Sequence, residues 1–362
     1  IHTGSERREL LKMEGQSLNG AIYSSGHLVF SRIPDNTRVW AVPFSLETLD
    51  LTGDPFLLIP DARFATASRG GDLSYVPRSR LLVQIVRLDA RGMVTEEIGE
   101  PIHDARHLTV SPDGRQAALH VEDQADEIWI IDLASGSRQR LHSSKEIVRD
   151  LNWTPDGEGL VFAAGPNTSM HQEIRLLDGS PATNIDIRGE DPILSRDGRT
   201  MLLTVWNEAN EESIGYVDLE DPDLEPTMIA ATSFSESGPV LSPDERFVAY
   251  ETLESGSREI VVRSFPDGQK RWDVSRDGGL HPFWSTSGDR LYFVTPSNGR
   301  LMAVDVQRDA GRFSAPYLVF ELDLIRYFNA RPDGSFIALK HLPGEQDGSY
   351  EIWLNWAQSL GK

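Results

Sequence analysis

The chain has 362 residues, with 35 basic and 56 acidic side chains, a formal net charge of −21 and no cysteine. The missing cysteine excludes disulfides, thiolate metal sites and cysteine nucleophiles, and the negative charge disfavours nucleic acid as a partner. No apolar run approaches the roughly 20 residues that a helix needs to cross a bilayer, so we expect a soluble chain without membrane insertion.

The predicted elements repeat along the chain. Each copy is an apolar strand, a tight turn of the type Ser-Pro-Asp-Gly and a second apolar strand. The last turn residues of the copies are Gly26, Gly71, Gly114, Gly157, Gly198, Glu245, Gly288 and Gly334. Successive turns are 41 to 47 residues apart, which is the period of a four-stranded propeller blade.

The recurrence of proline, aspartate and glycine in these turns has a physical reason. Proline presets φ for the second turn position, aspartate accepts hydrogen bonds from nearby backbone amides, and glycine tolerates a positive φ. The turn that ends in Glu245 lacks that glycine, so we expect it to have another geometry.

A third strand of β-branched and aromatic residues follows each hairpin, as in "EIWIID" from Glu127 and "EIWLN" from Glu351. Short segments such as "SRQRL" from Ser137 supply a fourth, outer strand. No stretch sustains helical periodicity beyond a turn or two. The sequence therefore predicts an all-β chain.

Eight copies of four strands indicate a single eight-bladed β-propeller of antiparallel blades. Only six residues follow the last third strand, so we expect the N-terminal segment 7–13 to complete the last blade and close the ring. A seven-bladed ring with one irregular copy is the alternative. The expected blades are 15–62, 63–102, 103–146, 147–191, 192–237, 238–279, 280–324 and 325–362 with 7–13.

These copies resemble the PD40, or TolB-like, propeller repeat, which also has the form of a strand, S-P-D-G, a strand and an "I-W-x-x-D" strand. The C-terminal half, with "SREIVVRSFPDGQKRWDVSRDGGLHPFWSTSGDRLYFV", is similar to the propeller at the C-terminus of bacterial eukaryotic-like Ser/Thr protein kinases. The resemblance implies an extracytoplasmic, periplasmic sensor or interaction module, with a kinase domain and a transmembrane helix preceding it in such proteins; a cytoplasmic location stays open.

A candidate site comes from comparing the copies in register. Four residues before each turn, and one residue earlier, the chain places polar and aromatic side chains that we expect at the entry of the innermost strands, around one mouth of the channel. The candidate ligand-binding residues are Phe64, His107, Asp150, Asp191, His281 and Tyr327, with Arg63, Arg106, Arg149 and Arg326 beside them.

Two imidazoles, two carboxylates and a phenol could hold a loosely bound cation or a polar ligand, and the arginines a carboxylate or phosphate. The alternative is that these residues are polar because they contact solvent, with the arginines paired to neighbouring carboxylates. Trp129, Trp153, Trp284 and Trp353 fall inside repeat strands and are expected in the core between blades, whereas Trp206, beside an acidic insertion, is a candidate for an exposed contact.

The sequence has no G-x-S-x-G elbow, P-loop, H-E-x-x-H or EF-hand pattern and no set of kinase motifs. We therefore expect a non-enzymatic propeller, without catalytic residues, cofactor or resident metal, that binds a protein, peptide or small polar ligand. Two alternatives stay open: a propeller-type lyase or hydrolase using a cation with His107 and His281, and a scaffold in a TolB-like envelope assembly.

Overall fold

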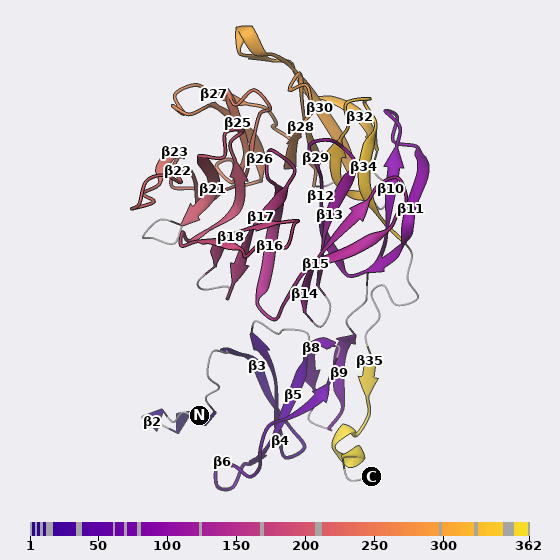
Figure 1. Cartoon of the computed structure of the whole chain (residues 1–362). Helices are drawn as coiled ribbons and strands as arrows, with labels where there is room; N and C mark the ends of the chain where they lie inside the picture. The colour runs from indigo at the N-terminus through magenta and orange to yellow at the C-terminus, as the bar shows by residue number, and fades with distance from the viewer. Residues whose placement is uncertain are drawn as a thin grey trace. The chain divides into compact units, whose positions relative to one another are not determined.

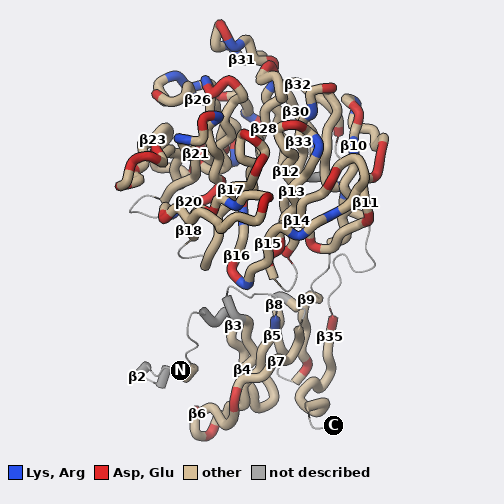
Figure 2. The backbone as a smooth tube through the Cα atoms, in the orientation of Figure 1, with Lys and Arg blue, Asp and Glu red and all other residues tan. Residues whose placement is uncertain are grey.

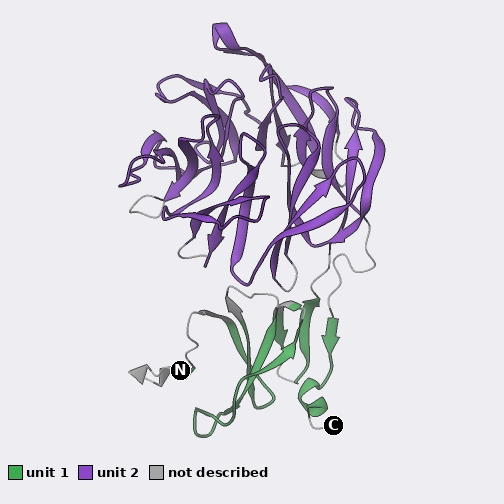
Figure 3. Ribbon diagram, viewed as in Figure 1, with its two compact units in different colours: residues 1–80, 343–362 green, residues 81–342 purple. Residues whose placement is uncertain are grey.

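The computed structural model describes residues 2–3, 6–7, 10–11, 17–33, 38–60, 62–68, 71–77, 81–122, 125–166, 170–206, 212–296, 299–321, 325–342 and 351–360. These residues form 35 strands and two short 3-10 helices, Arg308–Ala310 and Trp356–Ser359. The chain divides into two compact units: unit 1 comprises residues 1–80 and 343–362, and unit 2 comprises residues 81–342 (Figure 3).

Unit 2 contains six antiparallel sheets, or blades, each with four strands or more. Five follow the chain order. The first three are β12 (Ala105–Val110), β13 (Gln116–Glu122), β14 (Asp126–Asp132) and β15 (Arg138–Ser144); β16 (Ile147–Trp153), β17 (Gly159–Gly165), β18 (His171–Leu176) and β19 (Thr183–Ile185); and β20 (Gly189–Leu194), β21 (Thr200–Trp206), β22 (Glu212–Asp218) and β23 (Thr227–Ala230).

The next two are β24 (Glu236–Leu241), β25 (Phe247–Thr252), β26 (Glu259–Ser264) and β27 (Arg271–Asp273); and β28 (Leu280–Trp284), β29 (Arg290–Thr295) and β30 (Arg300–Gln307), with both β31 (Arg312–Phe313) and β32 (Tyr317–Glu321) paired to β30. The sixth blade joins the two ends of the unit, in the order β33 (Ile325–Ala330), β34 (Phe336–His341), β10 (Leu82–Leu88) and β11 (Val94–His103).

The turn between the first two strands of a blade has the geometry that its Ser-Pro-Asp-Gly sequence predicts. In the β12–β13 turn the Gly114 N–H donates to the Ser111 carbonyl (2.8 Å) at φ 72°. The Ser111 hydroxyl donates to Asp113 Oδ1 (2.7 Å), which also accepts from the Arg115 amide (3.0 Å). These donors lower the pKa of Asp113, with the hydroxyl contributing most. Each blade thus begins with a locally specified hairpin.

The prediction of a different geometry for the turn that ends in Glu245 is wrong. The Glu245 N–H donates to the Ser242 carbonyl at 2.8 Å, the same bond as in the glycine turns, and Glu245 itself lies at φ 55°. The residue adopts the left-handed conformation that glycine adopts elsewhere, so the turn type is kept at the cost of backbone strain.

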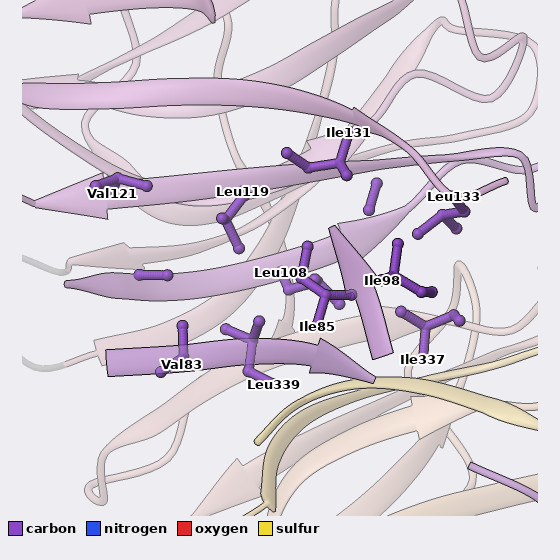
Figure 4. Close-up of a cluster of buried hydrophobic side chains, with 12 residues drawn as sticks. Val83, Ile85, Ile98, Leu108, Leu119, Val121, Ile131, Leu133, Ile337 and Leu339 are labelled. Carbon is purple, nitrogen blue, oxygen red and sulfur yellow. The ribbon is translucent and has the colours of Figure 1, made fainter. Parts of the chain in front are cut away.

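The hydrophobic core of unit 2 is a series of clusters between neighbouring blades. The cluster in Figure 4 joins the last blade to the first: Val83 and Ile85 come from β10, Ile337 from β34, and Leu108 and Leu119 from β12 and β13. Five further clusters join the other neighbouring pairs. Because inner strands β12, β16, β20, β24, β28 and β33 neighbour one another in a cycle, the ring closes without an open side.

Closure differs from the predicted one. The strand paired with β34 is β10, with Val83 opposite His341 and Leu88 opposite Phe336, and β34 and β10 lie side by side in Figure 1. The segment Glu351–Trp353, expected as the third strand there, forms β35 in another sheet. The predicted blades 63–102 and 325–362 therefore exchange strands. The strand β10, expected in blade 63–102, pairs with β34, and β35, expected in blade 325–362, pairs with β9. The predicted closing segment 7–13 falls largely outside the described residues; its first residue lies in β2, which pairs with β1.

Unit 1 holds the sheets from the first two copies. They are β3 (Ser17–Ser24), β4 (His27–Ile33), β5 (Val39–Ser45), β6 (Asp50–Leu51) and β7 (Phe56–Ile59); β8 (Ala62–Ala67), β9 (Leu73–Pro77) and β35 (Glu351–Trp353); and the ribbon of β1 (His2–Thr3) and β2 (Glu6–Arg7). Their core surrounds the fully buried Trp356, whose indole N–H donates to Ser24 Oγ (3.1 Å).

All eight copies of the repeat form antiparallel sheets, which confirms the all-β architecture and the count of copies. Six of these sheets form the closed ring of unit 2, and the sheets of the first two copies belong to unit 1. In the part of the chain that the structure describes, acidic and basic residues are spread over strands and loops of both units (Figure 2). Within the described residues, no helix has the length and apolar character needed to span a membrane.

Candidate functional site

The six inner strands of unit 2 carry one equivalent position each, which we call the inner ring. Its residues are His107, Asp150, Asp191, Gly238, His281 and Tyr327. Except on β12, the position coincides with a β-bulge, where the pairing with the second strand shifts. The ring residues are the second, third or fourth residues of their strands, and all except His107 lie at the bulge.

The bulges require a left-handed backbone. Gly238 has φ 63°, and four residues with side chains match it: Asp150 at 56°, Asp191 at 55°, His281 at 52° and Tyr327 at 54°. For bulky residues this conformation costs about 1 to 2 kcal/mol each. On β12 the bulge is displaced, because His107 pairs with His120 and the left-handed residue is Asp104.

One side of the inner ring is aromatic. The Tyr327 ring lies between two imidazoles, 5.6 Å from His107 at 54° and 6.1 Å from His281 at 41°, measured between ring centroids. We call these three residues the aromatic arc. Burial, with smaller effects from His120 and His281, lowers the pKa of His107 to about 4, so its imidazole is neutral at pH 7. The His281 side chain is 68% exposed.

The other side carries two carboxylates on adjacent strands, which we call the carboxylate pair. The Asp191 amide donates to Asp150 Oδ2 at 3.4 Å, and Asp191 Oδ2 accepts from the Thr204 hydroxyl (2.8 Å) and the Gly238 amide (3.1 Å). Burial and then the charge of Asp191 raise the pKa of Asp150 well above its ordinary value. Burial also raises the pKa of Asp191, although its two hydrogen-bond donors oppose the shift.

A third carboxylate continues this pattern. Glu251, on β25, accepts the His281 amide at 2.8 Å through Oε1, just as Asp150 and Asp191 accept the amides of the next blades. Its Oε2 accepts from Arg258 (2.8 Å). Glu251 was not predicted, because it comes from a second strand and a comparison of first strands does not reach it.

The candidate arginines that the structure describes are occupied. Arg149 Nη1 lies 3.4 Å from Glu190 Oε1, and Arg106 Nε lies 3.1 Å from Glu122 Oε2. Pairing of the arginines with neighbouring carboxylates was the alternative expectation, and these two contacts agree with it. The guanidinium groups of Arg149 and Arg106 therefore already lie next to carboxylates.

The remaining candidates divide between the units. Arg63 and Phe64 lie in β8 of unit 1, and Arg326 lies in β33 of unit 2; their side chains are outside the described residues. The structure thus brings together His107, Tyr327 and His281, and separately Asp150 and Asp191, on one closed ring of strands, while Arg63 and Phe64 belong to a sheet of the other unit.

Groups of metal ligands and two cavities can be compared with the position of the inner ring in the part of the chain that the structure describes. The described residues contain no group of three or more His, Asp or Glu side chains arranged to hold a metal ion. A cavity of about 190 Å³ is lined by Ile98 and Gly136 between the outer strands of the last and first blades, and one of about 170 Å³ lies at the turns of Ser285 and Arg331. Neither is lined by a ring residue.

The four tryptophans of the repeat strands pack against cores, whereas Trp206, expected as an exposed contact, is partly covered. Trp153 is buried between two blades, and Trp129, Trp284 and Trp353 pack against cores while partly exposed. Trp206 is half-buried, with the Arg188 guanidinium 5.1 Å from its ring centroid. Of the acidic insertion beside it, residues 207–212, all but Glu212 at the start of β22 lie outside the described residues.

The chain has the fold of a TolB-like β-propeller. It is similar to a solved TolB structure from Agrobacterium tumefaciens, with a TM-score of 0.56 and 17% identity over 73% of this chain and 99% of that one. It is also similar to hydrazine synthase from Kuenenia stuttgartiensis, with a TM-score of 0.52 and 16% identity over 78% and 95% of the two chains. At these identities the likeness concerns the fold alone.

Sequence comparison adds little. No family model matches the chain. A 117-residue stretch, 31% of the chain, is 32% identical to U3 small nucleolar RNA-associated protein 13 of Saccharomyces cerevisiae. The match spans only 14% of the length of that curated relative.

Proposed function

We propose that this chain is a non-enzymatic binding propeller that holds a protein, peptide or small polar ligand at the inner ring. The observation that carries the proposal is the left-handed backbone at Asp150, Asp191, His281 and Tyr327. Glycine would relieve the strain, as Gly238 does on β24, yet four strands keep a polar or aromatic side chain there. Strain kept at one position on successive blades is typical of a functional site.

The interactions of these side chains support the same proposal. The aromatic arc joins residues from three blades, and His281 leaves most of its surface to solvent. A ligand at the ring would therefore meet aromatic faces and carboxylates fixed by rigid strands, which lowers the entropic cost of binding.

The test is a ligand screen on the whole chain. Thermal shift with a library of peptides and polar metabolites is expected to give stabilising ligands, since a ligand present at 100 times its Kd adds about 2.7 kcal/mol. The double variant His281→Gly, Tyr327→Gly relieves backbone strain and is expected to keep its fold while weakening the same ligands at least tenfold. Ser25→Gly, which relieves a left-handed residue of unit 1 (φ 47°), is the matched control and should bind as the unaltered chain.

Two results would contradict the proposal: no ligand that stabilises the chain, or ligands that bind the double variant as tightly as the unaltered chain. A ligand that is cleaved or eliminated during incubation, detected by mass spectrometry, would favour the lyase or hydrolase alternative.

We further propose that the propeller works outside the cytoplasm, as the interaction module of a bacterial Ser/Thr kinase or as a free-standing TolB-like protein. The support is the resemblance of the repeat and the fold. Reading the encoding gene upstream of Ile1 tests the first option, because a kinase domain and a membrane helix would be found there. Localisation of the native protein to the cytoplasm would overturn both.

A further inference from the structure

The ionisable side chains around the inner ring favour one sign of ligand charge. Two arginines beside the inner ring are paired with glutamates, Arg149 with Glu190 and Arg106 with Glu122. The imidazole of His107 is neutral at pH 7, because its pKa is lowered to about 4. What the ring itself supplies is the carboxylate pair, so the electrostatic preference is for a cation.

The aromatic arc also favours a cationic ligand. A cation within about 6 Å of an aromatic face is attracted by the negative face of the ring. Tyr327 stands between two imidazoles whose planes tilt against it by 54° and 41°. Such surfaces also contact the aliphatic stem of a cation that carries one, which a bare metal ion lacks.

The carboxylate pair is suited to a hydrogen-bonding cation. Asp191 Oδ2 already accepts two hydrogen bonds, which fix its orientation. Ca²⁺ takes six to eight oxygen ligands, and the described residues contain no group of three or more acidic or imidazole side chains in such an arrangement. An ammonium or guanidinium group needs fewer partners, because each N–H directs one bond to one oxygen.

From these observations we propose that the inner ring binds an organic cation, an alkylammonium or guanidinium group, between the carboxylate pair and the aromatic arc. The inference rests on the proposed function, since it names the chemical class of the ligand at that same site. A Lys or Arg side chain of a peptide and a free diamine share this chemistry.

Binding of a cation would be linked to protons. The groups that act on the carboxylate pair are Glu190, Glu212 and Glu251, which raise its proton affinity, and Arg149, Thr204 and the Gly238 amide, which lower it. A bound cation favours the ionised pair, so the ligand releases protons and its affinity increases as pH rises through the titration of the pair.

The experiment is calorimetric titration of the whole chain with four probes: agmatine, the peptide Gly-Lys-Gly with an acetylated N-terminus and an amidated C-terminus, its uncharged analogue with norleucine in place of lysine and the same end groups, and CaCl₂. We expect agmatine or Gly-Lys-Gly to bind at least tenfold more tightly than the norleucine peptide, and more tightly at pH 8 than at pH 5. Binding of the peptide alone indicates a side chain of a polypeptide as ligand, and binding of both indicates the cationic group itself.

The variants Asp150→Asn and Asp191→Asn test the site. Each is expected to weaken the cationic probe at least tenfold and to reduce the pH dependence. Glu146→Gln, which removes one charge from an exposed residue just before β16, should change affinity less than twofold. Failure of both cationic probes to bind, or tighter binding of Ca²⁺ than of either, would overturn the inference.

The inference and the proposed function fail differently. Suppose that a neutral or anionic ligand from the screen binds the unaltered chain, no longer binds the double variant His281→Gly, Tyr327→Gly, and binds Asp150→Asn normally. The proposed cationic ligand is then wrong, but the proposed binding site is supported. If no ligand of any charge responds to the ring variants, both are wrong.

Discussion

Asn329 on β33 makes two hydrogen bonds to the backbone of β12: its Oδ1 accepts from the Val110 amide at 3.2 Å, and its Nδ2 donates to the Leu108 carbonyl at 3.1 Å. These bonds join the last blade to the first, across more than 200 residues of sequence. Asn152 holds the equivalent position on β16 and donates to the Pro192 carbonyl of the next blade at 3.2 Å.

Asn329→Ala is therefore expected to destabilise the chain by about 1 to 3 kcal/mol, since it removes two bonds and leaves partly buried backbone groups unpaired. Asn152→Ala, the matched control, removes one bond between blades that are also joined by the chain and should cost less. Urea unfolding of both variants measures the difference. Equal losses of unfolding free energy in the two variants would contradict the prediction, because they would show that the Asn329 bonds contribute no more than the single Asn152 bond.

The carboxylate pair gives a stability prediction with a definite sign. Because the folded-state pKa values of both aspartates are raised, the folded chain binds more protons than the unfolded chain between the ordinary and the raised pKa, and stability falls as pH rises through that window. Asp150→Asn is expected to increase stability at pH 7, because the neutral amide avoids the cost of burying a charge, and asparagine also tolerates the left-handed backbone. Thermal unfolding from pH 4 to 8 should show the gain at the alkaline end only.

His107 has the opposite dependence. Its folded-state pKa of about 4 lies below the ordinary value of 6.5, so the unfolded chain binds the extra proton and stability decreases as pH falls from about 6.5 to 4. The groups around it are Arg106, His120, His281 and Tyr327. His107→Phe should remove of the order of 2 kcal/mol of this acid loss. An unchanged acid profile in the variant would show that His107 is not desolvated.

Gly99 on β11 meets Gly136 across two blades, and a Cβ on Gly99 would lie 2.8 Å from the Gly136 carbonyl oxygen. Gly99→Ala should cost more than about 2 kcal/mol, from backbone strain and overpacking together. Gly179→Ala is the control for strain alone, because Gly179 has φ 83° and nothing lies within 4 Å of its Cβ position. A similar loss in both variants would exclude the close approach.

The repeat and its turns could be predicted from sequence because their physics is local. The Ser111 hydroxyl, the Asp113 carboxylate and Gly114 specify the turn within four residues, and the pattern recurs at a fixed period. The inner ring followed from counting back from these turns. The left-handed conformation at Tyr327 did not, because nothing in its residue type favours a positive φ.

The closure could not be predicted for a related reason. The runs "VQIVRLD" and "EIWLN" both have the residue pattern of a third strand, and no residue in either run specifies the hairpin with which it pairs. The pairing of β10 with β34 depends on how the ring closes in space. Likewise, the partners of Arg149 and Arg106 depend on side-chain placement across strands, which a linear comparison does not contain.

The way β10 and β34 pair sets how the ring of unit 2 would respond to mechanical force. The chain enters β10 at Leu82 and leaves β34 at His341, and both points lie at the same end of the ladder, next to the bond from the Leu342 amide to the Leu82 carbonyl (2.8 Å). A load applied between residues 81 and 342 would break the hydrogen bonds one after another from that end, as a zipper opens. A ladder loaded in shear would have to lose all of its bonds at once, so the seam of this ring is the part that yields at low tension.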